Sequence, residues 1–307
     1  MQMPSLLGIS LAAMLFAACS SNDALTATNP PSSNQMKQGA EHRSVSPVNS
    51  ESQLLYASNK ESSVIDIYSV PGYSKVGQIS NGLYEPEGIA TDENGNLYVA
   101  NTDGESVTIY KPETTSPYST LTESHGPDDV AVATNGYVLA GDLAGGVDVY
   151  APGKTSPSAR LTNPGISIVR SVGVDANNNV YAAGTNASSE GVVIEYTDMS
   201  GGGTNLGLQD LESPLGVLID KNDNVVVSDV GAGKVFIYPQ GKTSPSSEIS
   251  VAGPHRIALN QQENLIYVPQ GAGGDVDVLD YPSGTPVTSF SIGNFATGAA
   301  LSPAPTP

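Results

Sequence analysis

The sequence is poor in several residue types, and each shortage excludes a class of protein. It has no tryptophan, three histidines and one cysteine among 307 residues, so a disulfide within the chain is impossible. Only 12 lysine and arginine residues oppose 31 aspartate and glutamate residues, which gives a formal net charge of −19. A surface of that charge repels phosphate groups. The composition therefore excludes nucleic-acid binding and attachment to a membrane through a basic patch.

Residues that interrupt regular structure are abundant. The chain has 33 glycines, 22 prolines and 38% hydrophobic residues, which predicts a core crossed by frequent turns rather than one built from long helices. The longest apolar run, residues 6–18, is shorter than the roughly 20 residues needed to span a bilayer. A run of this length near the N-terminus is typical of the hydrophobic region of a signal peptide.

The end of this run carries an export motif. The segment Ala17-Ala18-Cys19-Ser20 resembles the lipobox of bacterial lipoproteins, in which the cysteine thiol receives diacylglycerol and becomes the new N-terminus. The resemblance implies a signal peptide at residues 1–19, lipidation at Cys19 and attachment to the cell envelope. By the sorting rule of that family, Ser20 favours the outer membrane in a bacterium with two membranes. Ordinary secretion is the alternative.

Residues 20–53 predict a disordered tether. They are rich in serine, asparagine, proline and glutamine and contain few large apolar side chains. Such a segment buries too little surface to offset the entropy lost on ordering. The lipid anchor, held on this tether, is then the only membrane contact that the sequence predicts.

The remaining residues, 54–307, contain a repeat of about 42 residues. The clearest unit, residues 86–122, shows four short β-strand patterns separated by polar turns. A tyrosine at the end of the third strand marks six units: Tyr68, Tyr110, Tyr150, Tyr196, Tyr238 and Tyr281. Six units of four antiparallel strands predict an all-β fold, a six-bladed β-propeller.

The two ends of the repeat predict how the ring closes. Residues 54–57 match a second strand and residues 297–301 match a first strand, so the C-terminal strand completes the N-terminal blade. Closure of this kind removes the exposed sheet edges of an open array. We therefore expect a monomer.

The repeat also carries a family resemblance. The sequence Pro-x-Gly-Ile-Ala-x-Asp at residues 86–92, followed by Gly-Asn-Leu-Tyr-Val at 95–99, resembles the NHL and YVTN types of repeat in exported bacterial propellers. Weaker copies occur at residues 127–132, 214–220 and 254–259. These motifs report blade geometry, which proteins of many functions share.

Two further patterns imitate ligand-binding motifs. The loops beginning at Asp92, Asp175 and Asp220 match the first half of a calcium loop, but they lack the glycine at its sixth position. This absence favours interpreting the three loops as tight turns. The Gly-Lys-Thr-Ser segments at residues 153–156 and 241–244 resemble the end of a phosphate-binding loop. Since both lie between predicted strands, with no helix after them, we interpret them as turns.

A ring of polar residues is predicted at one mouth of the central channel. The residue after the first-strand proline, or its equivalent, is Glu87, Asp128, Arg170, Leu215, His255 and Thr297 in the six blades, and the matching second-strand ends are Asn59, Asn101, Gly141, Gly184, Asp229 and Gln270. These groups suit a divalent cation, or zinc through His255 and His125, or general acid–base chemistry. The alternative is a hydrated mouth in which Arg170 forms an ion pair with Glu87 or Asp128.

The sequence favours a non-catalytic function. No nucleophile–base motif is present, so we expect an envelope-anchored propeller that binds a protein or a small-molecule ligand at one face, without a cofactor. The alternative is a metal-dependent hydrolase or lyase. Resemblance to gluconolactonase-like lactonases implies a divalent metal held by glutamate, asparagine and aspartate, for which Glu87, Asn101 and Asp229 are the candidates. Resemblance to streptogramin lyases is limited to the repeat.

Overall fold

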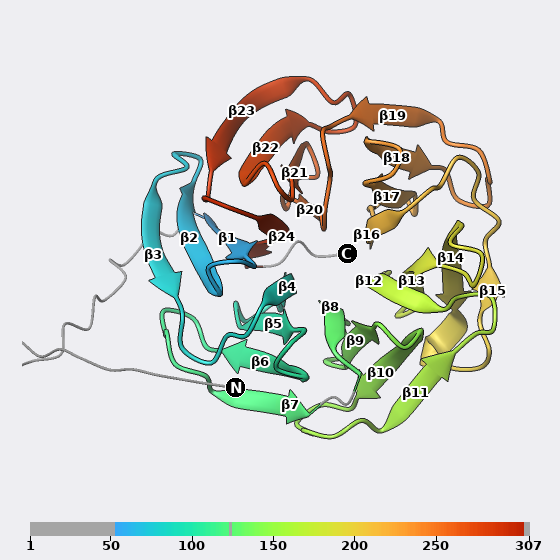
Figure 1. Ribbon diagram of the computed structural model, residues 1–307, viewed down its shortest axis with the longest axis horizontal. Coiled ribbons are helices and arrows are strands. Elements are labelled where there is room, and N and C mark those ends of the chain that lie inside the picture. The colour runs from blue at the N-terminus through green and yellow to red at the C-terminus, as the bar shows by residue number, and fades with distance from the viewer. Residues whose placement is uncertain (1–52, 123–124, 304–307) are drawn as a thin grey trace, which may run out of the picture. The chain divides into compact units, whose positions relative to one another are not determined.

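A computed structural model describes residues 53–122 and 125–303, which form six four-stranded antiparallel sheets. The sheets stand as blades around a central channel (Figure 1), so the prediction of an all-β, six-bladed propeller is confirmed. The only helical element among these residues is a short 3₁₀ turn, η1 (Thr197–Met199), and no helix here is long and apolar enough to cross a membrane. The predicted signal peptide, Cys19 and almost all of the tether lie outside the described residues.

Each blade runs from an innermost strand to an outermost strand. Blade 1 contains β24 (Ala296–Ser302), β1 (Gln53–Asn59), β2 (Val64–Val70) and β3 (Lys75–Ile79). Blade 2 contains β4 (Pro86–Thr91), β5 (Leu97–Asn101), β6 (Ser106–Tyr110) and β7 (Ser119–Thr122). Blade 3 contains β8 (Pro127–Val132), β9 (Val138–Asp142), β10 (Gly146–Tyr150) and β11 (Ala159–Thr162).

The other three blades repeat this order. Blade 4 contains β12 (Ile168–Val174), β13 (Val180–Thr185), β14 (Gly191–Tyr196) and β15 (Thr204–Asn205). Blade 5 contains β16 (Pro214–Ile219), β17 (Val225–Asp229), β18 (Lys234–Tyr238) and β19 (Ser247–Ser250). Blade 6 contains β20 (Ala258–Leu259), β21 (Leu265–Pro269), β22 (Asp275–Asp280) and β23 (Pro286–Ser291).

The C-terminal strand closes the ring. Strand β24 pairs antiparallel with β1 from Leu54↔Ser302 to Asn59↔Ala296, which confirms the predicted closure. The sheet that begins the described chain is therefore completed by the strand that ends it, and β1 has a partner strand on both sides.

The core lies between neighbouring blades. Strands β5, β9, β13 and β17 are almost wholly buried, and their two faces pack against different neighbouring sheets. In one cluster, Tyr98 and Ala100 of blade 2 pack with Val130 and Val138 of blade 3. The middle strands must therefore be apolar on both sides, which gives continuous rather than alternating hydrophobic runs.

The repeated tyrosine joins five of the six blades to the blade before each of them. The hydroxyls of five of the six donate hydrogen bonds to the preceding blade or to the segment that follows it: Tyr110 to Asn81 O (2.6 Å), Tyr150 to Thr122 O (2.8 Å), Tyr238 to Gln209 O (2.6 Å), Tyr68 to Ser291 O (3.5 Å) and Tyr281 to Asp220 Oδ2 (2.7 Å). The Tyr196 hydroxyl is buried and has no such partner within the described ranges. The marker that defines the repeat is thus a contact between blades.

The two motifs that imitate ligand sites are turns. Asp92 Oδ1 accepts hydrogen bonds from the backbone N–H groups of Asn94 and Asn96, both at 2.9 Å, and the loops at Asp175 and Asp220 repeat this pattern. The Gly-Lys-Thr-Ser segments connect β10 to β11 and β18 to β19. Both turn interpretations are confirmed.

Candidate binding site in the central channel

The six innermost strands begin at one face of the propeller, which we call the entry face, and end at the opposite exit face. Pro86, Pro127 and Pro214 open three of these strands and pair with the last residues of the second strands. The pairing register shifts immediately after each of these prolines. Such a bulge sets two residues against one on the partner strand and redirects their side chains. It allows Asp128 and the next residue, Asp129, both to contact groups at the channel.

Arg256 occupies the centre of the channel at the entry face. It comes from blade 6, and its Nη1 lies 2.8 Å from Glu87 Oε2 of blade 2. Its Nη2 contacts Asp128 Oδ2 of blade 3, and its Nε lies 4.0 Å from Asp129 Oδ1. All four side chains are buried, with 2–6% of each residue exposed. Burial of these charges is tolerated because each guanidinium or carboxylate has an opposite charge beside it.

Two further cations surround this centre. Lys60 Nζ lies 2.6 Å from Glu87 Oε1 and 3.3 Å from Glu85 Oε2. Arg170 Nη1 lies 3.5 Å from Asp128 Oδ2, as the sequence predicts for an ion pair with that residue. We call Arg256, Glu87, Asp128, Asp129, Lys60 and Arg170 the hub. With all six ionised, its formal charges cancel.

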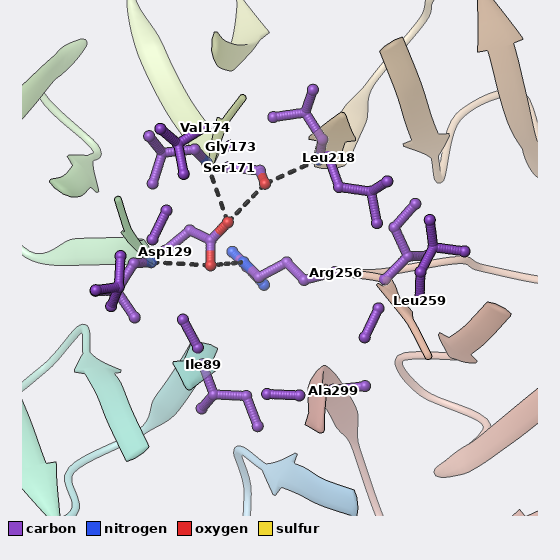
Figure 2. Close-up of a pocket in the computed structure, with 18 of the residues that line it drawn as sticks. Ile89, Asp129, Ser171, Gly173, Val174, Leu218, Arg256, Leu259 and Ala299 are labelled. Atoms are coloured by element: carbon purple, nitrogen blue, oxygen red, sulfur yellow. Dashed lines mark hydrogen bonds and ion pairs between the residues drawn. The ribbon is translucent and has the colours of Figure 1, made fainter. Parts of the chain in front are cut away.

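Asp129 links the hub to the next two blades (Figure 2). Its Oδ2 accepts hydrogen bonds from Ser171 Oγ at 2.6 Å and from Val172 N at 3.0 Å, while Ser171 Oγ accepts one from Val217 N at 3.0 Å. Burial raises the pKa of Asp129 to about 6, and Arg256 and these donors offset part of the rise. The hub and this chain of hydrogen bonds therefore join blades 2 to 6.

The remaining hub carboxylates have pKa values shifted in opposite directions. Burial raises the pKa of Glu87, but Arg256 and Lys60 together lower it by more than burial raises it. The pKa of Glu87 therefore lies below its ordinary value. Burial dominates at Asp128 and raises its pKa in spite of Arg256. Burial lowers the pKa of Arg256, yet Asp128 and Glu87 more than reverse this effect, so the guanidinium stays charged.

His255 lies beside the hub rather than in it. Its Nδ1 has no hydrogen-bond partner in the described part of the chain, and its ring meets Phe295 edge-on with centroids 5.4 Å apart. Burial, followed by repulsion from Arg256, lowers the pKa of His255 to about 4, so the ring is neutral at pH 7. The sequence alignment points to His255 as the channel residue of this blade. The structure gives that place to Arg256.

The second-strand ends hold loops rather than forming one site. Asn101 Oδ1 accepts from Tyr84 N at 3.0 Å, and Asn59 Nδ2 donates to Ile292 O at 2.8 Å. Asp229 accepts from the backbone N–H groups of residues 212, 213 and 232. Gln270 donates to Asp277.

Four further positions in the predicted ring, Leu215, Thr297, Gly141 and Gly184, carry no ionisable group. Leu215 is partly buried and apolar, and Thr297 Oγ1 donates to Pro86 O at 3.1 Å. Blade 3 ends its second strand at Asp142, one residue beyond the Gly141 that the sequence alignment selects. Asp142 forms a 2.5 Å ion pair with Arg160. Gly184 lies within β13.

The residues predicted as metal ligands are engaged separately. Glu87 pairs with Arg256 and Lys60, whereas Asn101 and Asp229 bind loops in different blades. No hydrogen bond or ion pair joins these three within residues 53–122 and 125–303. In the same ranges, no group of three or more His, Cys, Asp or Glu side chains is placed to hold a metal ion.

A cavity of about 210 Å³ lies directly beneath the hub. Figure 2 shows it surrounded by the innermost strands, with Ile89, Leu218, Leu259 and Ala299 around it and Arg256 extending across toward Asp129. The residues that line it continue to the ends of the innermost strands at the exit face. The hub therefore lies at the entry-face end of a cavity whose walls reach the exit face.

Comparison with known proteins supports the fold. No family model matches this chain, and no curated protein matches it. Among solved structures, it is similar to a chain in the crystal structure of a nidogen/laminin complex, with a TM-score of 0.66, 14% sequence identity, and coverage of 83% of this chain and 99% of that chain. At this identity the likeness shows the fold alone. The NHL and YVTN resemblance stays a prediction.

Proposed function

We propose that this protein is an exported, envelope-attached propeller of the NHL or YVTN type that binds a protein partner through its entry face, without catalysis. The observation that carries the choice of face is a pair of exposed apolar side chains on adjacent blades. Tyr84 is 63% exposed in the loop before β4, and Leu143 is 36% exposed in the loop after β9. Tyrosine on a rigid surface offers a large contact area at a low cost in side-chain entropy.

Two hydrogen bonds place these residues on the entry face. Tyr84 N donates to Asn101 Oδ1 at the end of β5, and Leu143 N donates to Gly126 O just before β8. Both loops are thereby held against the ends of strands. A partner that docks on them meets a surface that is largely formed before binding, which reduces the entropy cost of association.

The hub favours binding over catalysis. Glu87 and Asp128 are both committed to Arg256, Asp129 accepts hydrogen bonds from Ser171 and Val172, and a pKa lowered to about 4 does not suit His255 to exchange protons as a base near neutral pH. The solved neighbour comes from a complex of two proteins, which supports a protein as the kind of partner. A monomeric ring anchored through Cys19 would present this face on a tether.

Site-specific photo-crosslinking in cells tests the proposal. A photoreactive phenylalanine analogue replaces Tyr84 in one variant and Tyr118 in another. Tyr118 is a matched control, because it is 64% exposed and lies at the opposite end of its blade, in the loop between β6 and β7. We expect a discrete adduct from Tyr84 alone. Equal adducts from both positions, or none from Tyr84, would contradict the choice of face.

Anchoring is tested separately by lipid labelling. The wild-type chain should incorporate radiolabelled palmitate and sediment with membranes, whereas Cys19→Ser should do neither. If both chains or neither chain were labelled, lipid attachment at Cys19 would be wrong. Export would then be the part of the proposed localisation that remains. This experiment does not depend on the face that binds.

A further inference from the structure

A pocket of about 380 Å³ lies at the entry face, to one side of the hub. Its walls are the loop between β21 and β22, the segment that leads into β20, Val230 just after β17 and Phe295 just before β24. These segments lie where second strands end and innermost strands begin, which places the pocket on the entry face. We call it the blade-6 pocket.

The wall of the blade-6 pocket is largely apolar. Alanine and glycine supply most of it, Val230 and Phe295 add larger apolar surfaces, and none of the described residues that line it is charged. The polar residues in this lining are His255 and Gln270, and the amide nitrogen of Gln270 is already bonded to Asp277. Such a lining favours a neutral ligand, because an ion would lose its hydration without an opposite charge in return.

The imidazole of His255 has unused hydrogen-bonding capacity in this pocket. The backbone N–H of His255 donates to Pro269 O at 2.8 Å and its C=O accepts from Ser228 Oγ, but neither ring nitrogen has a partner in residues 53–122 and 125–303. Nδ1 is sealed from solvent, so the ring is reached from the side of Nε2, which lies beside Gly271. A Cβ at position 271 would lie 2.4 Å from Nε2, so only glycine leaves this nitrogen room.

The charge state of His255 decides which group can complete its hydrogen bonds. Burial, followed by repulsion from Arg256, lowers the pKa of His255 to about 4, so the ring is neutral at pH 7. In a neutral imidazole, Nε2 donates or accepts a hydrogen bond according to which nitrogen carries the proton. A hydroxyl group both donates and accepts, so it can complete either arrangement.

We propose that the blade-6 pocket binds a neutral aromatic alcohol of the phenol class, with its hydroxyl hydrogen-bonded to Nε2 of His255 and its ring packed against Phe295. The rings of Phe295 and His255 have centroids 5.4 Å apart, so a molecule that packs on the first lies next to the second. An apolar cavity of about 150 Å³ holds benzene. A pocket of about 380 Å³ is therefore sufficient for a molecule of one or two rings.

The blade-6 pocket is independent of the proposed partner surface. Its walls come from blades 5, 6 and 1, whereas Tyr84 and Leu143 lie beside blades 2 and 3. Failure of the crosslinking experiment therefore leaves this inference standing, and a failed ligand experiment leaves the partner surface standing.

Fluorescence of 2-naphthol provides a direct test with the full chain. The protein has no tryptophan, so excitation at a wavelength that tyrosine does not absorb reports the added naphthol alone. We expect saturable binding of 2-naphthol and its displacement by phenol. Phenol should displace it at least as well as benzene does, although phenol is the more strongly hydrated of the two.

A variant of His255 tests the hydrogen bond. His255→Phe keeps an aromatic ring beside Phe295 but removes both nitrogens. It should weaken 2-naphthol binding about two- to twelvefold, the range for one neutral hydrogen bond. Binding of naphthalene, which has no hydroxyl, should stay the same, and this comparison isolates the hydrogen bond from any change in the shape of the pocket.

A second variant and a matched control locate the site. Ala272 is exposed in the pocket wall, so Ala272→Phe should fill the pocket and abolish binding of both ligands. Ala187 is exposed in the corresponding loop of blade 4, between β13 and β14, and Ala187→Phe should leave binding intact.

Three results would overturn the inference. These are non-saturable naphthol fluorescence, an equal effect of His255→Phe on 2-naphthol and naphthalene, and unchanged binding by Ala272→Phe. If His255→Phe does not fold, the two alanine variants decide the location, and weaker displacement by phenol than by benzene in the wild-type protein would overturn the role of the hydroxyl.

Discussion

Replacing Arg256 with methionine should destabilise the propeller strongly. The substitution removes the cation shared by Glu87 and Asp128 and leaves both carboxylates buried, with only 6% and 2% of their surfaces exposed. Removing one partner of a buried ion pair costs about 3–5 kcal/mol, because the remaining charge keeps its desolvation penalty. We therefore expect a loss of that size in the free energy of unfolding at pH 7, measured by urea denaturation.

The same carboxylate provides a matched control. Arg170 also contacts Asp128, but at 3.5 Å and with 38% of its side chain exposed, so Arg170→Met should cost no more than about 1 kcal/mol. Losses of equal size in the two variants would refute the argument that burial of the partner sets the cost.

The loss should also depend on pH. In the wild-type protein the folded-state pKa of Glu87 is lowered, so its contribution to stability is present at pH 7 and is lost as pH falls. Without Arg256, Lys60 remains to oppose the burial of Glu87, but the pKa values of Glu87 and Asp128 both rise from their wild-type positions, so protonation favours the folded variant more than it favours the wild type. The difference between the two proteins should therefore narrow at pH 5. A difference that stays constant from pH 7 to pH 5 would contradict this account.

Two further predictions concern the tyrosine contacts and His255. Tyr238→Phe removes the hydrogen bond to Gln209 O and should lower the free energy of unfolding by about 1 kcal/mol. Tyr196→Phe removes a buried hydroxyl without a partner among the described residues, so it should be neutral or stabilising. Equal losses in the two variants would contradict this difference in hydrogen bonding. Because the pKa of His255 is lowered from 6.5 to about 4, the unfolded chain binds more protons in that window and the wild type loses stability as pH falls through it. Relative to the wild type, His255→Gln should therefore gain up to about 2 kcal/mol between pH 6.5 and pH 4.5 in urea denaturation, and a constant difference would count against a neutral buried ring.

The roughly 42-residue periodicity was sufficient to predict the blades, because the strands and turns of each repeat are determined by residues close together in the sequence. The tyrosine spacing identified all six units, and the match of residues 54–57 to a second strand identified the closing pair with β24. Turn chemistry was equally local, since Asp92 satisfies backbone groups only two and four residues away. Features fixed by short-range geometry were thus accessible without a structure.

The centre of the channel was less accessible, because its contacts join distant residues across irregular backbone. Alignment by the first-strand proline selected His255, yet Arg256 is the residue that reaches Glu87, 169 positions away in sequence. The bulges after the prolines break the alternation on which the alignment depends, and they also bring Asp129 into the hub beside Asp128. Three acidic residues, Glu87, Asp128 and Asp129, contact Arg256, and buried carboxylates require a cation beside them. That requirement was the signal by which the sequence could have indicated Arg256.

The hub also connects the two faces of the propeller physically. Arg256 lines the cavity and is bound to Glu87, and Glu87 is bound in turn to Lys60. Lys60 also pairs with Glu85, the neighbour of the exposed Tyr84. These contacts are contiguous, but contiguity alone does not establish coupling. Coupling requires a molecule bound in the cavity to favour one arrangement of this chain of ion pairs, and any effect on partner affinity must then appear as an equal effect of the partner on the affinity of that molecule.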